Sequence, residues 1–164
     1  MKFYIKLKHF AQYRSFKIRD EHQGELYEIS GTFKRGMKSL VMEDMNNQVI
    51  YTIERKFNLS RVRHYVVTDE VGKEAATVAR SRFTSNPVYT VHVGDHVLTF
   101  EGDVKKHAFT LHDQEEARVS IEQGTFEFGE AYEITVNAPS RPLLYLFLAI
   151  AIDQMNHERE KVKG

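Results

Sequence analysis

Residues 143–152 read Leu-Leu-Tyr-Leu-Phe-Leu-Ala-Ile-Ala-Ile, and this apolar run decides how the chain folds. A helix that is apolar on every side must also be enclosed on every side. The run is about half the roughly 20 residues that a helix needs to cross a bilayer. We therefore expect the rest of the chain to form a wall around this helix, with Asp153 and Gln154 closing the apolar run.

The segment Pro139-Ser140-Arg141-Pro142 is the strongest punctuation in the chain and marks the start of the helix. Ser140 is a suitable N-cap, and Pro142 is tolerated in a first helical turn. The pattern predicts a helix over about 141–158. The charged tail 159–164 is expected to project into solvent.

Residues 1–138 consist of short apolar segments separated by Gly, Asn, Asp and Ser. Regularly spaced short strands with no helical pattern between them indicate an antiparallel barrel or sandwich. The twelve expected strands are 2–8, 14–20, 25–33, 38–44, 48–57, 61–69, 75–83, 88–93, 96–102, 104–113, 117–126 and 130–137. Because no linker divides them, we expect residues 1–164 to form a single domain.

Two turns, Gly94-Asp95 and Asn46-Asn47, allow the strand register to be predicted. The expected pairs are Val93 with His96, Val91 with Leu98 and Tyr89 with Phe100 across the first turn, and Met42 with Tyr51 and Leu40 with Ile53 across the second. Each register gives one apolar face and one polar face, as a wall with one buried side requires.

Four strands end in aspartate, at Asp20, Asp44, Asp69 and Asp113. An aspartate at a strand end can accept hydrogen bonds from nearby backbone N–H groups and so shape a turn. We interpret the four as turn residues and not as a set of catalytic carboxylates.

The stretch Phe16-Lys17-Ile18-Arg19-Asp20 through Gly24 to Tyr27-Glu28-Ile29-Ser30-Gly31, the hairpin near Asp44 and the helix 142–155 resemble the tubby C-terminal-like superfamily. The nearest branch is the LURP-one-related group, including its small bacterial members, and phospholipid scramblases share the same features. The resemblance implies a mainly β fold: a closed antiparallel barrel of about twelve strands, with the C-terminal hydrophobic helix threaded through its centre.

Charge and composition set limits on function. Lys plus Arg and Asp plus Glu both total 23, so the formal net charge is zero. The charge is divided unevenly, because residues 1–82 hold 16 basic and 10 acidic residues, a balance of +6, and residues 83–164 hold the remaining 7 and 13, a balance of −6. There are no cysteines, and the charged N-terminus lacks the apolar stretch of a signal peptide. We expect a cytoplasmic protein without a transmembrane span.

The motifs of most enzyme classes are missing from the sequence. There is no Gly-x-Ser-x-Gly elbow, no glycine-rich phosphate loop before a helix, and no Glu-x-Glu-x-Lys stripe of the triphosphate-hydrolysing tunnel barrels. The close histidines His92 and His96 fall on opposite sheet faces, and His107 and His112 differ in parity, so we expect no metal or other cofactor. The balanced charge and the lack of an RNP-like strand also argue against nucleic-acid binding.

Basic residues spaced two apart share a face of a strand and can hold a phosphate group between them. The pairs are Lys17 with Arg19, Arg61 with Arg63, and Arg80 with Arg82, all expected on the exterior. Lys17-Ile18-Arg19 also matches the Lys-x-Arg strand motif through which tubby proteins bind phosphoinositide headgroups. An ordinary solvated exterior is the alternative reading of the same residues.

Three functional hypotheses remain. The first is a non-catalytic binding or scaffold module that recognises an anionic ligand, such as a phospholipid headgroup, at the periphery of a membrane. The second is a regulatory protein–protein interaction module, and the third is an enzyme of unknown class. The sequence does not distinguish among oligomeric states.

Overall fold

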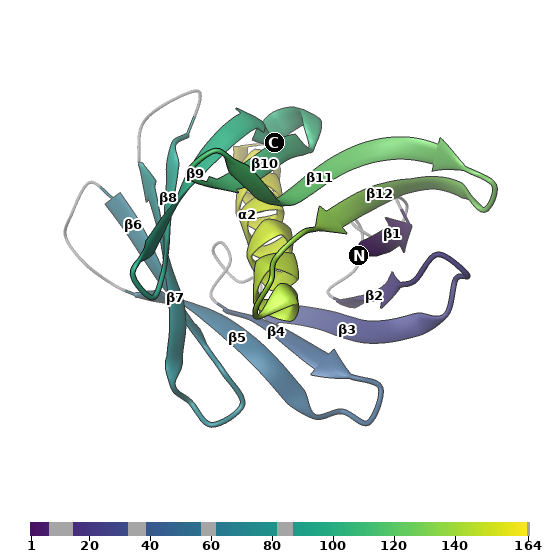
Figure 1. The fold of residues 1–164 in the computed structure, drawn as a ribbon, viewed down its shortest axis with the longest axis horizontal. Helices are drawn as coiled ribbons and strands as arrows, with labels where there is room; N and C mark the ends of the chain where they lie inside the picture. The colour runs from purple at the N-terminus through teal and green to yellow at the C-terminus, as the bar shows by residue number, and fades with distance from the viewer. Residues whose placement is uncertain (7–14, 33–38, 57–61, 82–86, 164) are drawn as a thin grey trace.

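The computed structural model of the protein describes residues 1–6, 15–32, 39–56, 62–81 and 87–163, with only the backbone described for 32 and 156–163. Within these ranges twelve strands form a closed barrel, every neighbouring pair antiparallel, around one long helix (Figure 1). The strands are β1 Lys2–Lys6, β2 Ser15–Arg19, β3 Glu25–Thr32, β4 Ser39–Asp44, β5 Val49–Lys56, β6 Val62–Thr68, β7 Glu74–Ser81, β8 Tyr89–Val93, β9 His96–Asp103, β10 Ala108–Asp113, β11 Glu116–Phe126 and β12 Gly129–Val136. Of the barrel and the sandwich that the alternating segments allowed, the structure shows the closed barrel that the resemblance implied.

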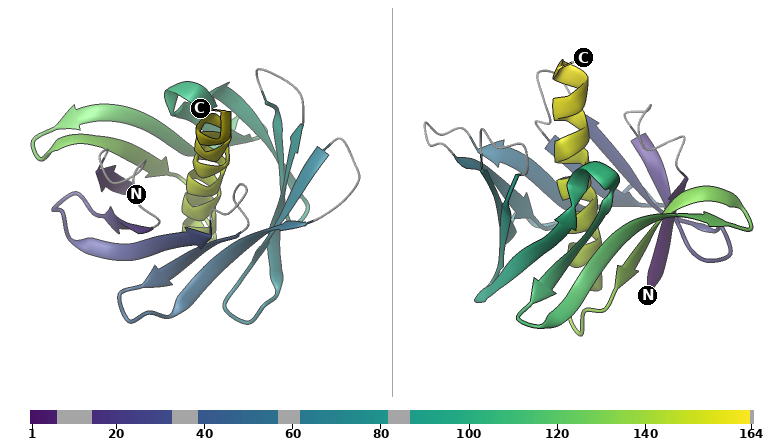
Figure 2. Two further views of the ribbon diagram at one scale, coloured as in Figure 1. Left: turned by 180° about the vertical axis from the view of Figure 1, so that it is seen from behind. Right: turned by 90° about the horizontal axis from the view of Figure 1, so that it is seen from above.

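The barrel has two different ends, because consecutive connections between antiparallel strands alternate between them. One end, here called the short-turn end, carries the turns 20–24, 44–48, 69–73, 94–95 and 113–116 and the start of α2 (Pro142–Lys163). The other, here called the connector end, is where β1, β3, β5, β7, β9 and β11 finish. The helix runs from the first end to the second, and its last turns extend past the strands (Figure 2, right).

The predicted registers hold for the apolar pairs. Val93 pairs with His96 and Val91 with Leu98, and the rings of Tyr89 and Phe100 lie 5.1 Å apart. Across the other hairpin, Leu40 pairs with Ile53 and Met42 with Tyr51. The turn there is wider than expected: the pairing shifts after Met42, and the Asp44 N–H donates to the Gln48 carbonyl at 3.0 Å.

Three of the four strand-end aspartates shape turns as predicted. The carboxylates of Asp20, Asp44 and Asp69 each accept two backbone N–H groups, from the residues two and four positions later, at 2.8–3.1 Å. Asp113 differs from the other three, because its Oδ2 lies 2.8 Å from Nδ1 of His96 and 4.0 Å from Nε of Arg118.

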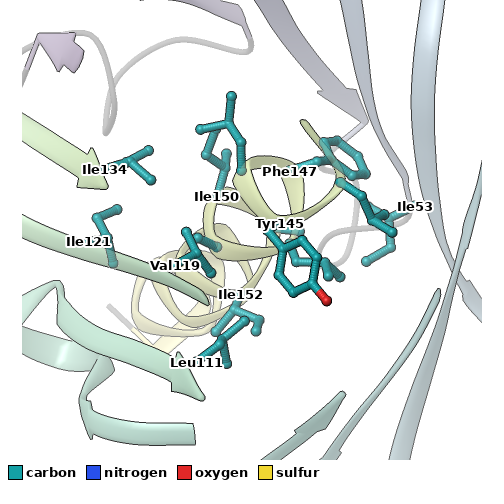
Figure 3. Close-up of a cluster of buried hydrophobic side chains, with 14 of the residues drawn as sticks. Ile53, Leu111, Val119, Ile121, Ile134, Tyr145, Phe147, Ile150 and Ile152 are labelled. Atoms are coloured by element: carbon teal, nitrogen blue, oxygen red, sulfur yellow. The ribbon is translucent and has the colours of Figure 1, made fainter. Parts of the chain in front are cut away.

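The apolar run forms the centre of the core, as predicted. From Leu144 to Gln154, no side chain of α2 is more than 7% exposed. The ring of Phe147 stacks on Tyr51 at 6.0 Å, and Figure 3 shows the helix side chains pointing outward to the wall, with Ile152 toward Leu111. Each buried Leu, Ile or Phe side chain contributes roughly 1.5–3 kcal/mol to stability. The buried side chains of the helix are therefore a main contribution to the stability of the barrel.

Four details of the sequence-based prediction need correction. The helix ends at Lys163 and not near 158, so the expected tail is helical backbone. Arg141, not Ser140, directly precedes the helix, and its carbonyl accepts from the Leu144 N–H at 3.0 Å. Asp153 and Gln154 are buried with the apolar run instead of closing it. The segment 104–113 begins with a 3₁₀ turn, η1 Val104–Lys106, because the Asp103 carboxylate accepts from the Lys105 N–H at 2.9 Å and His107 takes a left-handed conformation.

For the part of the chain that is described, no helix combines the length and apolar character needed to traverse a lipid bilayer.

Candidate functional site

Lys17 and Arg19 lie on the outer face of β2, as the alternation with buried Phe16 and Ile18 predicts. Both are already ion-paired with the neighbouring strand: Lys17 Nζ donates to Glu28 Oε2 at 2.9 Å, and Arg19 to Glu25 Oε1 at 3.2 Å. The hydrogen bond to Glu28 raises the pKa of Lys17 above its usual value. These two cations are therefore matched by carboxylates, which weakens them as a site for an external anion.

Arg80 lies on the face of β7 opposite to the one predicted. It was expected on the exterior, but it is only 2% exposed, because Ala76, Val78 and Arg80 share the inner face of the strand. Its Nε donates to the Tyr89 hydroxyl at 3.1 Å, and the guanidinium carbon lies 5.9 Å from the Tyr89 ring centroid. Burial raises the pKa of Tyr89, and Arg80 opposes that rise.

Arg63 also faces inward, contrary to the prediction. It lies directly opposite Arg80 in the β6–β7 register, next to the buried pair Tyr65 and Val78. Its Nε is buried and has no hydrogen-bond partner among the described residues. The other two predicted arginines, Arg61 and Arg82, fall outside the described residues.

Arg55 is a third inward arginine, and it was not among the residues predicted from the sequence. It follows Tyr51 and Ile53 along the inner face of β5 and lies opposite Tyr65 on β6. The signal was available in the sequence, because the alternation that buries Ile53 also turns Arg55 inward. Arg55, Arg63 and Arg80 are together called the inner arginine cluster; they sit on three adjacent strands near the connector end, and none forms an ion pair within the described ranges.

A buried acid faces this end of the barrel from the helix. Asp153 is fully buried, and its Oδ1 lies 2.7 Å from Nδ1 of His107, the residue that ends η1. The ring of His107 meets Tyr132 edge-on at 5.0 Å, and burial, followed by the charge of Asp153, raises the pKa of Tyr132. Sequence reasoning missed this pair, because its members are 46 residues apart and only the packing of α2 joins them.

The short-turn end is acidic. Its five turns contain Asp20, Glu21, Asp44, Asp69, Glu70, Asp95, Asp113, Glu115 and Glu116. Lys73 is the one Lys or Arg of these turns, and Arg141 lies at the same end before α2. A hollow of about 540 Å³ opens here and is lined by His96, Asp113, Gln114, Glu115, Glu116 and Arg118. Its charges are paired with one another, as Arg118 Nη1 lies 3.0 Å from Glu116 Oε2. Nowhere in the described ranges do three His, Asp or Glu side chains gather as metal ligands would.

The connector end has the opposite charge. Lys105 and Lys106 are exposed there, and Lys6 and Lys56 end β1 and β5. The described acidic residues at the same end are Asp103, which ends β9, and Glu127 and Glu130 of the β11–β12 hairpin. The four segments between the strands that finish at this end, residues 7–14, 33–38, 57–61 and 82–86, lie outside the described residues. Their sequences contain Lys8, Arg14, Lys34, Arg35, Lys38, Arg61 and Arg82, no Asp or Glu, and one Phe each.

Comparison with known proteins agrees with this architecture. The profile of a family described as LURP-one-related matches residues 1–153. The chain is 25% identical over 161 residues to the uncharacterised protein YxjI of Bacillus subtilis (strain 168), covering 97% of both chains. It also superimposes on the X-ray structure of a protein from Arabidopsis thaliana with a TM-score of 0.63 and 13% identity, covering 94% of this chain and 91% of the other. At that identity the structural match speaks for the fold alone.

Proposed function

Because the chain belongs to the LURP-one-related family, we propose that it is a non-catalytic, tubby-like binding or scaffold module for an anionic ligand. The ligand class that we favour is a phospholipid headgroup at the surface of a membrane, bound by a cytoplasmic protein that associates peripherally. The observation that carries the proposal is the opposite charge of the two barrel ends, with exposed Lys105 and Lys106 at one and the acidic turns at the other.

A protein with one basic and one acidic end has a preferred orientation near a negatively charged surface. An anionic leaflet attracts a Lys or Arg near it by roughly 1 kcal/mol per residue, and the attraction decays within a Debye length of about 8 Å at physiological salt. The acidic turns are repelled by the same surface. Both effects turn the connector end toward the lipid and the short-turn end away from it.

The sequences of the four connecting segments support the same orientation. Basic residues accompanied by aromatic residues are typical of membrane-interface segments, where the charge meets headgroups and the ring meets the acyl boundary. The seven Lys and Arg residues of these segments are not offset by any carboxylate.

Sedimentation with phosphatidylcholine vesicles, with and without phosphatidylserine, tests the proposal. We expect binding only to the vesicles that contain phosphatidylserine, and release at high ionic strength. Replacing both Lys105 and Lys106 by Glu should weaken binding about 30-fold or more, since two lysines contribute about 1 kcal/mol each and 1.4 kcal/mol is a factor of ten. Lys73→Glu, an exposed charge reversal at the opposite end, is the matched control. Equal binding to both kinds of vesicle, or equal weakening by the control, would rule the proposal out.

Exposed apolar side chains at the short-turn end favour a second candidate, a regulatory protein–protein interaction module. Met45 is 44% exposed, Val71 is 78% exposed, and they occupy the tips of the neighbouring β4–β5 and β6–β7 hairpins. A stoichiometric protein complex that is lost on replacing Met45 and Val71 by Asp, in a protein that does not bind vesicles, would favour this candidate over the first.

A further inference from the structure

We propose that the inner arginine cluster is a binding site for a phosphate-type oxyanion, held inside the wall of the barrel at its connector end. The proposal shares with the function proposed above the premise of an anionic ligand. It does not require a membrane surface, so each can fail without the other.

Positive charge is buried in the inner arginine cluster without a matching negative charge. Arg80 is 2% exposed, and the Nε of Arg63 is buried without a partner, yet no described carboxylate forms an ion pair with either. Taking an ionised group out of water costs several kcal/mol unless a counter-charge or a full set of hydrogen bonds replaces the water. Tyr89 satisfies only the Nε of Arg80. The remaining guanidinium donors are suited to an anion.

The β6–β7 register brings two of these positive charges together. Arg63 and Arg80 are directly opposite each other on adjacent strands and point to the same face. The Cβ atoms of directly opposed residues lie about 4.5–5.5 Å apart, and like charges in these positions destabilise a sheet. Arg55, opposite Tyr65, adds a third positive charge to the same inner face. One anion that accepts from two guanidinium groups would turn this repulsion into two attractive contacts.

The buried acid of the helix, Asp153, does not neutralise the cluster. Asp153 lies close enough to Tyr89 to raise the pKa of that tyrosine. Its carboxylate, however, is held by His107 at 2.7 Å and forms no ion pair with Arg63 or Arg80. Three arginines against one aspartate leave an excess of positive charge on this part of the interior.

The neighbouring hydroxyl group completes the chemistry of the site. The Tyr89 oxygen accepts from Arg80, so its own O–H remains available to donate. Burial raises the pKa of Tyr89, which keeps the phenol protonated at neutral pH. The free guanidinium N–H groups and the Tyr89 O–H can all donate to a ligand, which suits the acceptor oxygens of a phosphate, sulfate or phosphomonoester.

Thermal unfolding in the presence of inorganic phosphate, with chloride at the same ionic strength as reference, tests the site. A ligand at ten times its Kd should raise the Tm of a domain of this size by about 3–6 °C. We expect that rise in the wild-type protein and none in Arg63→Met or Arg80→Met. Without anion, Arg80→Met should melt no lower than the wild type, because an apolar side chain of similar length removes an uncompensated buried charge. Arg19→Met is the control, since Arg19 is paired with Glu25 on the exterior and its loss should leave the phosphate response intact.

Glycerol 3-phosphate and vesicles distinguish the source of the phosphate. A larger Tm rise with glycerol 3-phosphate than with inorganic phosphate at equal concentration assigns the site to a headgroup, and the reverse assigns it to a free phosphate. A phosphate response in a protein that ignores phosphatidylserine vesicles supports the inner site and refutes the membrane role. No rise above chloride, or an equal rise in Arg63→Met and the wild type, would overturn the proposal; Arg63 is partly exposed, so this variant remains informative if Arg80→Met does not fold.

Discussion

Truncating Phe147 in the middle of the helix should remove a large part of the stability of the whole protein. The side chain is fully buried and its ring stacks on Tyr51 of β5 at 6.0 Å. Phe→Ala in a close-packed core costs about 3–5 kcal/mol, and a lost aromatic pair contributes about 0.5–1.5 kcal/mol of such a change. Against a typical total of about 5–15 kcal/mol, Phe147→Ala should leave a folded but marginal protein.

Urea unfolding followed by circular dichroism measures this loss. At about 2–4 °C per kcal/mol for a domain of this size, the Tm should also fall by about 6–20 °C. Leu143→Ala is the matched control: it lies one turn earlier on the same helix, is only partly buried, and should cost about 1 kcal/mol. The slope m should stay unchanged in both variants, because each alters stability and not the area exposed on unfolding.

The difference in unfolding free energy between the two variants decides whether Phe147 is packed inside the barrel. If Phe147→Ala cost less than 1 kcal/mol, or no more than Leu143→Ala, the ring would not be packed inside the wall. The assignment of α2 as the shared core of all twelve strands would then be wrong.

Three further predictions concern the wall. Gly102→Ala should lower the free energy of unfolding by about 2 kcal/mol or more, because φ is +126° and a Cβ would lie 2.5 Å from the Ala108 carbonyl oxygen. Gly124→Ala is the control and should cost less than about 1 kcal/mol, since only the movable Phe126 ring is close. Equal losses of stability in urea would contradict this. Asp44→Ala should cost about 1–2 kcal/mol of stability, because the Asn46 and Gln48 N–H groups lose the carboxylate that accepts from them. Asp44→Asn should cost less. An unchanged urea midpoint for Asp44→Ala would exclude the turn role. Burial, with the hydrogen bond to Glu133, raises the pKa of Tyr4 to about 12 from an ordinary value near 10. The unfolded chain therefore loses this proton first, and the free energy of unfolding should fall between pH 10 and pH 12. Tyr4→Phe should reduce that fall in unfolding curves measured across this range, and an unchanged pH dependence would contradict the assignment.

Alternation was enough to predict the wall. Two-residue periodicity placed Leu40 opposite Ile53 and Val91 opposite Leu98, since a shift by one residue would turn every apolar side chain outward. The same rule also buries Arg80, because Ala76 and Val78 precede it on the inner face. The exterior position predicted for Arg80 is wrong because its position in the strand, and not the charge of its side chain, decides which face it occupies.

Other features of the site depend on contacts that no local pattern encodes. His107 and Asp153 meet because a 3₁₀ turn at the end of β9 reaches the helix inside the barrel. The opposite charges of the two barrel ends emerge only when the connections are sorted by end, since acidic and basic segments alternate along the chain and cancel in its net charge.

Native-state hydrogen exchange of the α2 amides tests most directly whether the helix is enclosed by the barrel. Amides of the buried turns around Leu146 and Ile150 should exchange only through global unfolding, with the same opening free energy as the most protected strands. If these amides exchanged through a local opening of lower free energy while the strands stayed protected, the barrel would remain folded without the helix. That result would contradict the account.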